Sequence, residues 1–270
     1  MILAVSNIAW SPEEEPAAIQ LLQSHGINNL EVAPLRWWPA ASTTSAEVMR
    51  TIADTLPAEF GVVAFQAILF GHPELTIFDS AEIRRATILF LSHIAGLAQA
   101  AGARAMVFGA PKNRRMPDGL AVPAANEIAM EFFSAIASEA AAKEVYFCIE
   151  PNPSAYGCNY LTDTNQAAEM VCRVCSPGLR LQLDAGALAL NNEDIESIVT
   201  RHRDIIGHVH VGEPMLENFD QPWEGHSRLA KVLSDVGYDG TVSIEMKRPA
   251  NGLAGVHRAI DFVIDTYVDG

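Results

Sequence analysis

Positive charge is scarce in this chain, which has 18 Lys and Arg residues against 33 Asp and Glu residues and a formal net charge of −15 at pH 7. A surface this acidic repels polyanions and anionic lipid headgroups. We therefore expect neither nucleic acid nor a membrane among the partners of this protein, although a local basic pocket is compatible with the overall charge.

Cysteines and long apolar runs are scarce as well. Four cysteines in 270 residues do not make a disulfide framework, and Cys172 and Cys175 form a C-x-x-C without a second such pair. The most apolar run, residues 62–70, is too short to cross a bilayer. The first residues lack the cationic region of a signal peptide. These absences favour a cytoplasmic protein with reduced thiols.

Two kinds of segment alternate along the whole chain. Short β-rich runs occupy residues 2–6, 27–33, 60–68, 103–109, 145–151, 179–185, 205–211 and 241–246. Helix-like amphipathic segments lie between them, for example 83–102, 126–143, 165–175 and 226–237. Eight such units in about 250 residues predict an α/β fold, a single (β/α)8 TIM barrel.

An open doubly wound sheet is the alternative fold. It is disfavoured because no G-x-G-x-x-G follows any predicted strand and no P-loop motif is present. No linker, low-complexity tract or charge run divides the chain either. We therefore expect residues 1–270 to form one domain.

The last four predicted strands share a pattern at their C-terminal ends. Strand side chains of a barrel alternate between the interior and the surrounding helices, and functional groups sit at the C-terminal strand ends. One ionisable side chain per strand is expected to point into the barrel mouth: Glu150, Asp184, His210 and Glu245. Three crowded carboxylates repel each other unless protons or a cation neutralise them. The set suits one divalent metal ion, Mn²⁺ or Mg²⁺ above all, and is compatible with Co²⁺ or Zn²⁺.

Deeper positions on the same strand faces are polar or small. Gln182 and His208 lie two residues before the predicted ligands of their strands. We expect both to support the ligands by hydrogen bonding rather than to bind the metal. Glu31, in the second predicted strand, is expected to point inward and to serve in structural hydrogen bonding.

The segments VYFCIEPNP, LRLQLDAG, IGHVHVGEP and GYDGTVSIEM resemble the xylose isomerase-like barrel superfamily of sugar isomerases and epimerases. The pattern is similar to that of the ketose 3-epimerases, in which Glu, Asp, His and Glu on strands five to eight hold a divalent metal. The resemblance assigns these roles to Glu150, Asp184, His210 and Glu245. It also implies that Glu150 and Glu245 are the catalytic acid/base pair.

The activity implied by the resemblance is isomerisation or epimerisation of a sugar or sugar derivative. A metal chelated by a carbonyl oxygen and the neighbouring hydroxyl acidifies the adjacent hydrogen, so that a proton leaves and returns through a metal-stabilised enediolate. A dehydratase of a keto-polyol or cyclic keto acid remains an alternative on the same metal site. A non-catalytic carbohydrate-binding barrel is an alternative of another class. Homo-oligomerisation is left open, since similar barrels are often dimers or tetramers.

Two positions depart from the ketose 3-epimerase pattern. Ala187 replaces a histidine three residues past the strand-six aspartate, and the loop GEPMLENFDQPWEGH lacks an arginine. Glu213 in that loop matches a glutamate of the family and is expected to contact substrate. The superfamily also contains apurinic-site endonucleases with a histidine-rich cluster of three zinc ions. Ala187 and Gly109 stand where that cluster needs histidines, so a nuclease is disfavoured.

Further substrate contacts are expected around the mouth. Lys112 and Arg114, in the segment 108–115, could hold a phosphate or carboxylate, or could belong to a solvated basic loop. Lys247 follows the last predicted ligand and is expected to face the mouth. Asn152, two residues after Glu150, is a further candidate for binding substrate.

Overall fold

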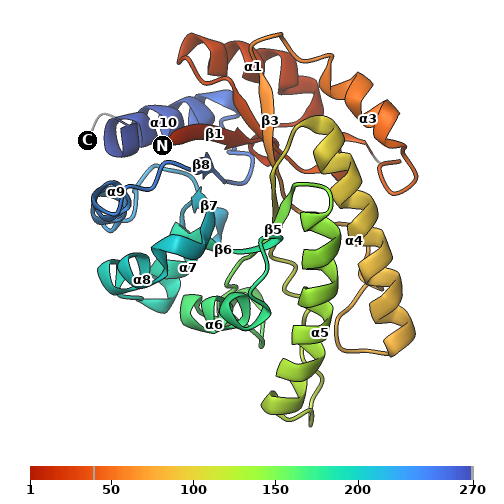
Figure 1. Ribbon diagram of the computed structural model, residues 1–270. Helices are drawn as coiled ribbons and strands as arrows, with labels where there is room; N and C mark the ends of the chain where they lie inside the picture. The colour runs from red at the N-terminus through yellow and green to blue at the C-terminus, as the bar shows by residue number, and fades with distance from the viewer. Residues whose placement is uncertain (39, 269–270) are drawn as a thin grey trace.

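A computed structural model describes residues 1–38 and 40–268 of the chain. Its eight strands pair in sequence order, all parallel, and close into a barrel as β1 pairs with β8 (Figure 1). They are β1 Ile2–Ser6, β2 Asn29–Val32, β3 Gly61–Phe65, β4 Ala105–Phe108, β5 Tyr146–Ile149, β6 Leu179–Asp184, β7 Ile206–Val211 and β8 Thr241–Ile244. The predicted (β/α)8 barrel is confirmed, and each observed strand lies within one of the eight predicted runs.

The helices surround the barrel and cover its outer face (Figure 1). They are α1 Glu15–Ser24, α2 Pro34–Trp37, α3 Ala46–Ala53, α4 Ala81–Ala101, α5 Val122–Ala141, α6 Thr164–Val174, α7 Ala185–Asn191, α8 Ile195–His202, α9 His226–Asp235 and α10 Leu253–Val263. Five of these ten, α3, α4, α6, α7 and α8, begin at a Ser or Asp cap. Helix α4 ends at Gly102, which adopts a left-handed conformation. Within the described residues, no helix is both long and apolar enough to span a membrane.

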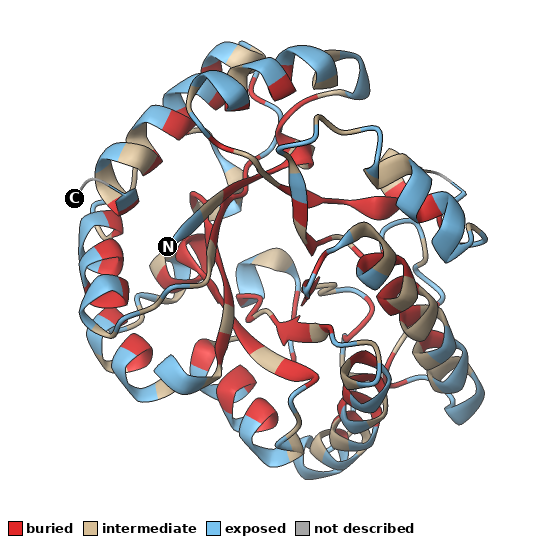
Figure 2. Cartoon of the chain, turned by 45° about the horizontal axis from the view of Figure 1, so that its top comes forward, coloured by how far each residue is buried: buried red, intermediate tan, exposed pale blue. Residues whose placement is uncertain are grey.

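Alternation along the strands separates two packing environments. The outward-facing residues of β5 to β8, such as Phe147 and Leu183, join one large apolar core with the inner faces of the helices. Cys148, the inward neighbour of Phe147, instead packs in the barrel interior with Ala64 and Ala105. Figure 2 shows buried residues on the strands and on the helix faces turned toward them. The barrel interior thus combines these small residues with buried polar side chains nearer the C-terminal strand ends, such as His208 and His210.

Strand register sets which side chains meet at the mouth. Asp184 lies directly opposite His210 across the β6–β7 pair, after a register shift between Leu181 and Gln182. Glu150 and Glu245 lie one residue past the observed ends of β5 and β8. Their backbone amides still continue the ladder, Glu150 N to Phe108 O at 3.2 Å and Glu245 N to Val211 O at 3.1 Å. All four side chains are thus fixed by the sheet rather than by mobile loops.

Gly178, just before β6, is a point of close backbone packing. A Cβ atom there would lie 2.8 Å from the carbonyl carbon of Ala137 and 2.9 Å from the amide nitrogen of Ala141, both in α5. We expect Gly178→Ala to lower the free energy of unfolding by about 3 kcal/mol, because helix backbone cannot move aside as a side chain can. Urea denaturation followed by circular dichroism measures the change.

Gly61→Ala is the matched control, since nothing lies within 4 Å of a Cβ at that position. It should change the free energy of unfolding by no more than about 0.5 kcal/mol. Equal stability of the two variants would contradict this description of the α5–β6 contact.

Candidate active site

Four side chains from consecutive strands converge at the C-terminal mouth of the barrel. One potential ligand atom from each of Glu150, Asp184, His210 and Glu245 lies within 4.8 Å of all the others. The Nδ1 atom of His210 is 3.3 Å from Glu150 Oε1 and 3.1 Å from Glu245 Oε2. The His210 side chain is fully buried, whereas those of Glu150 and Glu245 are 13% and 10% exposed. The imidazole therefore forms the floor of the cluster, and the glutamates reach toward the solvent side.

The two nitrogens of His210 have different surroundings. Nε2 lies 3.0 and 3.1 Å from the two carboxylate oxygens of Glu31. An ionised carboxylate only accepts hydrogen bonds, so Nε2 carries a proton. Nδ1 is buried and makes no hydrogen bond to any described residue, although it faces two carboxylates. A carboxylate behind the imidazole and an unpartnered nitrogen in front of it suit a metal-binding histidine.

Asp184 combines its place in the cluster with a role in the backbone. It is the N-cap of α7, where its Oδ1 accepts a hydrogen bond from Ala187 N at 2.8 Å. This bond fixes the orientation of the carboxylate at the end of β6. Because three carboxylate groups and one imidazole nitrogen meet here, the donor set fits a hard divalent cation such as Mn²⁺ or Mg²⁺ and also fits Zn²⁺.

Charge crowding displaces the pKa values of these groups. Burial raises the pKa of Asp184 well above its ordinary value, and the charges of Glu150 and Glu245 raise it further. Burial also raises the pKa of Glu245, against the opposing effect of His210. The pKa of Glu150 is lowered in spite of burial, because His210 and Asn152 stabilise its anion. Burial alone would lower the pKa of His210, but Glu245 and Glu31 raise it well above 6.5.

Glu31 has a more central position than the sequence indicated. It is fully buried in β2, where it bonds His210 and lies 3.3 Å from His208 Nε2. Burial alone would raise the pKa of Glu31, but the two histidines hold it below its ordinary value. The sequence signal for the bond from Glu31 to His210 was a carboxylate between the apolar residues Leu30 and Val32 of a predicted strand. His208 and Gln182, two residues before His210 and Asp184 in their strands, are both fully buried. Neither side chain makes a hydrogen bond to a described residue, so their support of the ligands by hydrogen bonding stays a prediction.

Arg114 is fully buried beside the cluster rather than exposed in the mouth. Its guanidinium donates to the backbone carbonyls of Phe108 at 3.2 Å, Glu150 at 2.6 Å and Leu161 at 3.4 Å. Its donors are thus occupied by the protein, which argues against the predicted contact with substrate. The side chain instead fastens the segment after β4 to the backbone of Glu150.

Of the other predicted substrate contacts, Asn152 and Glu213 are buried, whereas Lys112 and Lys247 are exposed. Asn152 is buried and donates to Glu150 Oε2 at 3.0 Å, so it lies at the cluster. Glu213 is also buried, but His226 Nε2 lies 2.9 Å from its Oε1 and the amide of Trp223 donates to it. Lys112 and Lys247 are both exposed. The carboxylate nearest to Lys247 Nζ is Glu217, at 4.0 Å.

Tyr156, in the loop after β5, is a mouth residue that the sequence did not single out. Its hydroxyl accepts a hydrogen bond from the amide of Met215 at 3.1 Å, which ties together the loops after β5 and β7. Burial raises the pKa of Tyr156 to about 12, and the charges of Asp184 and Glu150 contribute. The phenol therefore lies near the carboxylates and stays protonated at neutral pH.

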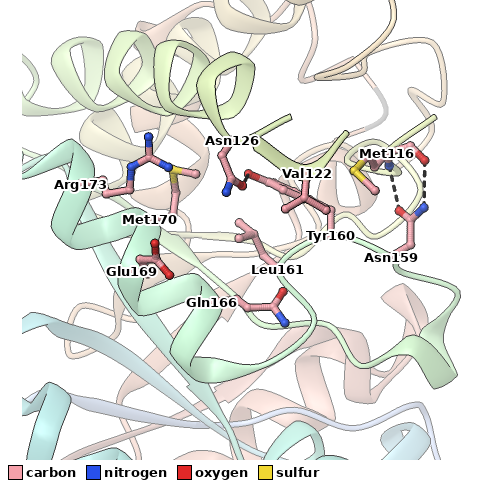
Figure 3. A pocket seen from close by; sticks show the side chains of 10 residues that line it. All are labelled: Met116, Val122, Asn126, Asn159, Tyr160, Leu161, Gln166, Glu169, Met170 and Arg173. Atoms are coloured by element: carbon pink, nitrogen blue, oxygen red, sulfur yellow. Dashed lines mark hydrogen bonds between the residues drawn. The ribbon is translucent and has the colours of Figure 1, made fainter. Parts of the chain in front are cut away.

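A separate surface pocket lies between α5 and α6, away from the cluster (Figure 3). Side chains such as Asn126, Gln166 and Arg173 line it. None of the four clustered residues does. We therefore place the candidate active site at the barrel mouth.

Comparison with known proteins gives one family and many similar folds. Residues 19–266 match the model of the family described as xylose isomerase-like TIM barrel. A D-psicose 3-epimerase solved in the presence of D-fructose has a TM-score of 0.82 at 15% identity, covering 99% of both chains. The D-psicose 3-epimerase of Clostridium cellulolyticum H10, solved with D-tagatose, has a TM-score of 0.80 at 16% identity, again covering 99% of both chains.

The IolI protein, solved with a bound zinc atom, is a third similar structure. Its TM-score is 0.74 at 17% identity, and the alignment covers 100% of this chain and 97% of that one. No match was found among curated protein sequences. At these identities the structural likenesses concern the fold.

Removing the buried guanidinium tests the structural role of Arg114. We expect Arg114→Leu to lower the free energy of unfolding by about 3 kcal/mol, because three backbone carbonyls each lose one of their hydrogen-bond donors and the buried side chain loses its packing. Denaturant titration measures the difference. The adjacent Arg115 is exposed, so Arg115→Leu should stay within about 0.5 kcal/mol of the wild type. Equal effects of the two substitutions would refute the assignment.

Proposed function

The chain belongs to the xylose isomerase-like TIM barrel family, and we propose that it is a metal-dependent isomerase or epimerase of a sugar or sugar derivative. The observation that carries the proposal is the set of three carboxylates around the unpartnered Nδ1 of His210 at the barrel mouth. We extend the proposal to residues 1–270 as a single catalytic domain.

Glu150, Asp184, His210 and Glu245 would hold the divalent ion. When bound there, the ion supplies Lewis acidity to a carbonyl oxygen and the neighbouring hydroxyl of the substrate. Glu31 would keep the proton of His210 on Nε2 and so leave Nδ1 free to bind. Ala187 N would hold the Asp184 carboxylate in place.

Glu150 and Glu245 are the proposed proton carriers. They approach His210 from strands β5 and β8, and both carboxylates reach the solvent side of the cluster. One carboxylate would take the proton beside the substrate carbonyl, and the other would return a proton to the opposite face. Return to the same carbon epimerises the sugar, whereas return to the neighbouring carbon interconverts ketose and aldose.

The surroundings of the cluster favour an uncharged polyol as substrate. Arg114, the nearest buried cation, is engaged with backbone carbonyls. Asn152 and Tyr156 instead offer an amide and a phenol at the mouth. Such groups suit sugar hydroxyls, so the ketohexoses D-fructose and D-tagatose, found with the similar 3-epimerases, are the first compounds to test.

Metal binding should compete with protons. The pKa values of His210, Asp184 and Glu245 are raised, so protons compete with a metal for these groups more strongly than they do for isolated side chains. We expect the affinity for Mn²⁺ to increase between pH 5.5 and pH 8, by up to about tenfold per pH unit for each proton released. Calorimetry in buffers of different ionisation enthalpy counts the protons.

Asp184→Asn is the matched variant for this measurement. The amide oxygen can still cap α7, but the charge is lost, so Mn²⁺ affinity should fall at least about tenfold while the fold persists. An affinity that is independent of pH, or that is unchanged in the variant, would argue against metal binding by these four residues.

Proton transfer is tested directly in D₂O. With D-fructose, D-tagatose and a broader sugar panel, the wild type should exchange hydrogen for deuterium at the carbon beside the carbonyl. Glu150→Gln and Glu245→Gln should each slow this exchange at least about 100-fold, since each removes a proton carrier. Nuclear magnetic resonance follows the exchange, and metal analysis of each variant shows whether the ion is retained.

Glu131→Gln, on the exposed face of α5, is the control and should leave the exchange unchanged. Loss of water with a new conjugated-carbonyl absorbance would instead identify a dehydratase. Metal and sugar binding that persist in both site variants, without turnover by the wild type, would identify a binding protein.

A further inference from the structure

A second group of metal-ligating side chains lies on the outer surface of the barrel. His25 is the C-cap of α1, and His257 and Asp261 lie one helical turn apart on α10. One ligand atom from each residue lies within 4.8 Å of the other two. These helices belong to the two ends of the chain, which meet where β1 pairs with β8 (Figure 1).

Both distances from an imidazole nitrogen to the Asp261 carboxylate are close to the separation of two ligands of one zinc ion. His25 Nε2 lies 3.3 Å from Asp261 Oδ1, and His257 Nε2 lies 3.5 Å from Asp261 Oδ2. Ligand atoms bound tetrahedrally at about 2.0–2.1 Å from Zn²⁺ lie roughly 3.3 Å apart. The two imidazole rings are 4.8 Å apart between centroids and inclined by 71°, so they do not stack face to face.

A backbone hydrogen bond prepares His25 for a cation. Its Nδ1 lies 2.9 Å from the carbonyl oxygen of Leu21, which can only accept a hydrogen bond. The proton of the neutral ring therefore belongs on Nδ1, and the Nε2 lone pair points toward the Asp261 carboxylate. A cation between the two groups makes this arrangement favourable, and a backbone carbonyl behind the imidazole is the usual support of a metal-binding histidine.

We propose that His25, His257 and Asp261 form a second metal site, selective for Zn²⁺ or a similar transition metal. Two imidazoles and one carboxylate suit Zn²⁺, in contrast to the carboxylate-rich set at the barrel mouth. The side chains of His257 and Asp261 are 51% and 56% exposed, which leaves room for water at the fourth position. The bound ion would tie α1 to α10 and so fasten the two ends of the chain beside the closure of the barrel.

The experiment counts zinc ions and locates them by substitution. Metal-free full-length protein is titrated with Zn²⁺ in four forms: wild type, His257→Gln, Glu150→Gln/Asp184→Asn, and the three substitutions combined. In that order, we expect the four forms to bind two, one, one and zero Zn²⁺ ions per chain. In the Glu150→Gln/Asp184→Asn background, Zn²⁺ should also raise the melting temperature, and His257→Gln should abolish that rise.

Controls separate this site from the barrel mouth and from general histidine binding. His202→Gln removes a partly exposed histidine outside the group and should leave both the stoichiometry and the melting shift unchanged. Asp261→Asn preserves side-chain size and should weaken Zn²⁺ binding at least about tenfold. If the mouth does not bind metal, the wild type takes up one ion and His257→Gln none, so failure of the proposed function remains distinguishable.

The proposal is overturned if Glu150→Gln/Asp184→Asn protein binds no Zn²⁺, or binds it equally well after His257→Gln. Either result would leave Asp261 as an ion-pair partner of two histidines.

Discussion

The crowding of negative charge around His210 is the constraint on which the site depends. Glu150 and Glu245 face its Nδ1 atom, Asp184 stands opposite it across the β6–β7 pair, and Glu31 binds its Nε2 atom. Four carboxylates near one imidazole repel each other strongly in a buried setting unless positive charge compensates them. The raised pKa values of Asp184 and Glu245 show that this crowding favours their protonated forms. A divalent ion would do so with a defined geometry.

The barrel holds this unfavourable arrangement by fixing each group through its backbone. Glu150 and Glu245 extend the strand ladder, and Asp184 caps α7. The guanidinium of Arg114 binds the carbonyl of Glu150 from behind. Gly109, directly after β4, leaves the space that the Glu150 carboxylate occupies, since a Cβ there would collide with it. Rigid support of this kind preorganises a site for a cation and for proton transfer.

Strand periodicity was enough to predict the barrel and the convergence of the four residues at its mouth. Alternation along β5 to β8 places Phe147 outside and Cys148 inside without knowledge of the tertiary structure. The hydrogen-bond partners of buried polar groups could not be predicted from the sequence. Glu31 and His210 are 179 residues apart in the chain, and nothing local shows that they meet. Arg114 looks like a surface cation in sequence because its carbonyl partners come from distant loops. For the same reason, the pairing of Glu213 with His226 and the position of Tyr156 appear only in the fold.

The central claim is that the carboxylates of Glu150, Asp184 and Glu245 and the Nδ1 atom of His210 bind one divalent ion. Anomalous diffraction from crystals soaked in Mn²⁺ tests it most directly. We predict one strong anomalous peak among the four side chains, about 2.0–2.3 Å from His210 Nδ1. A mouth without such a peak at saturating Mn²⁺, with His210 Nδ1 bonded to a glutamate, would contradict the account.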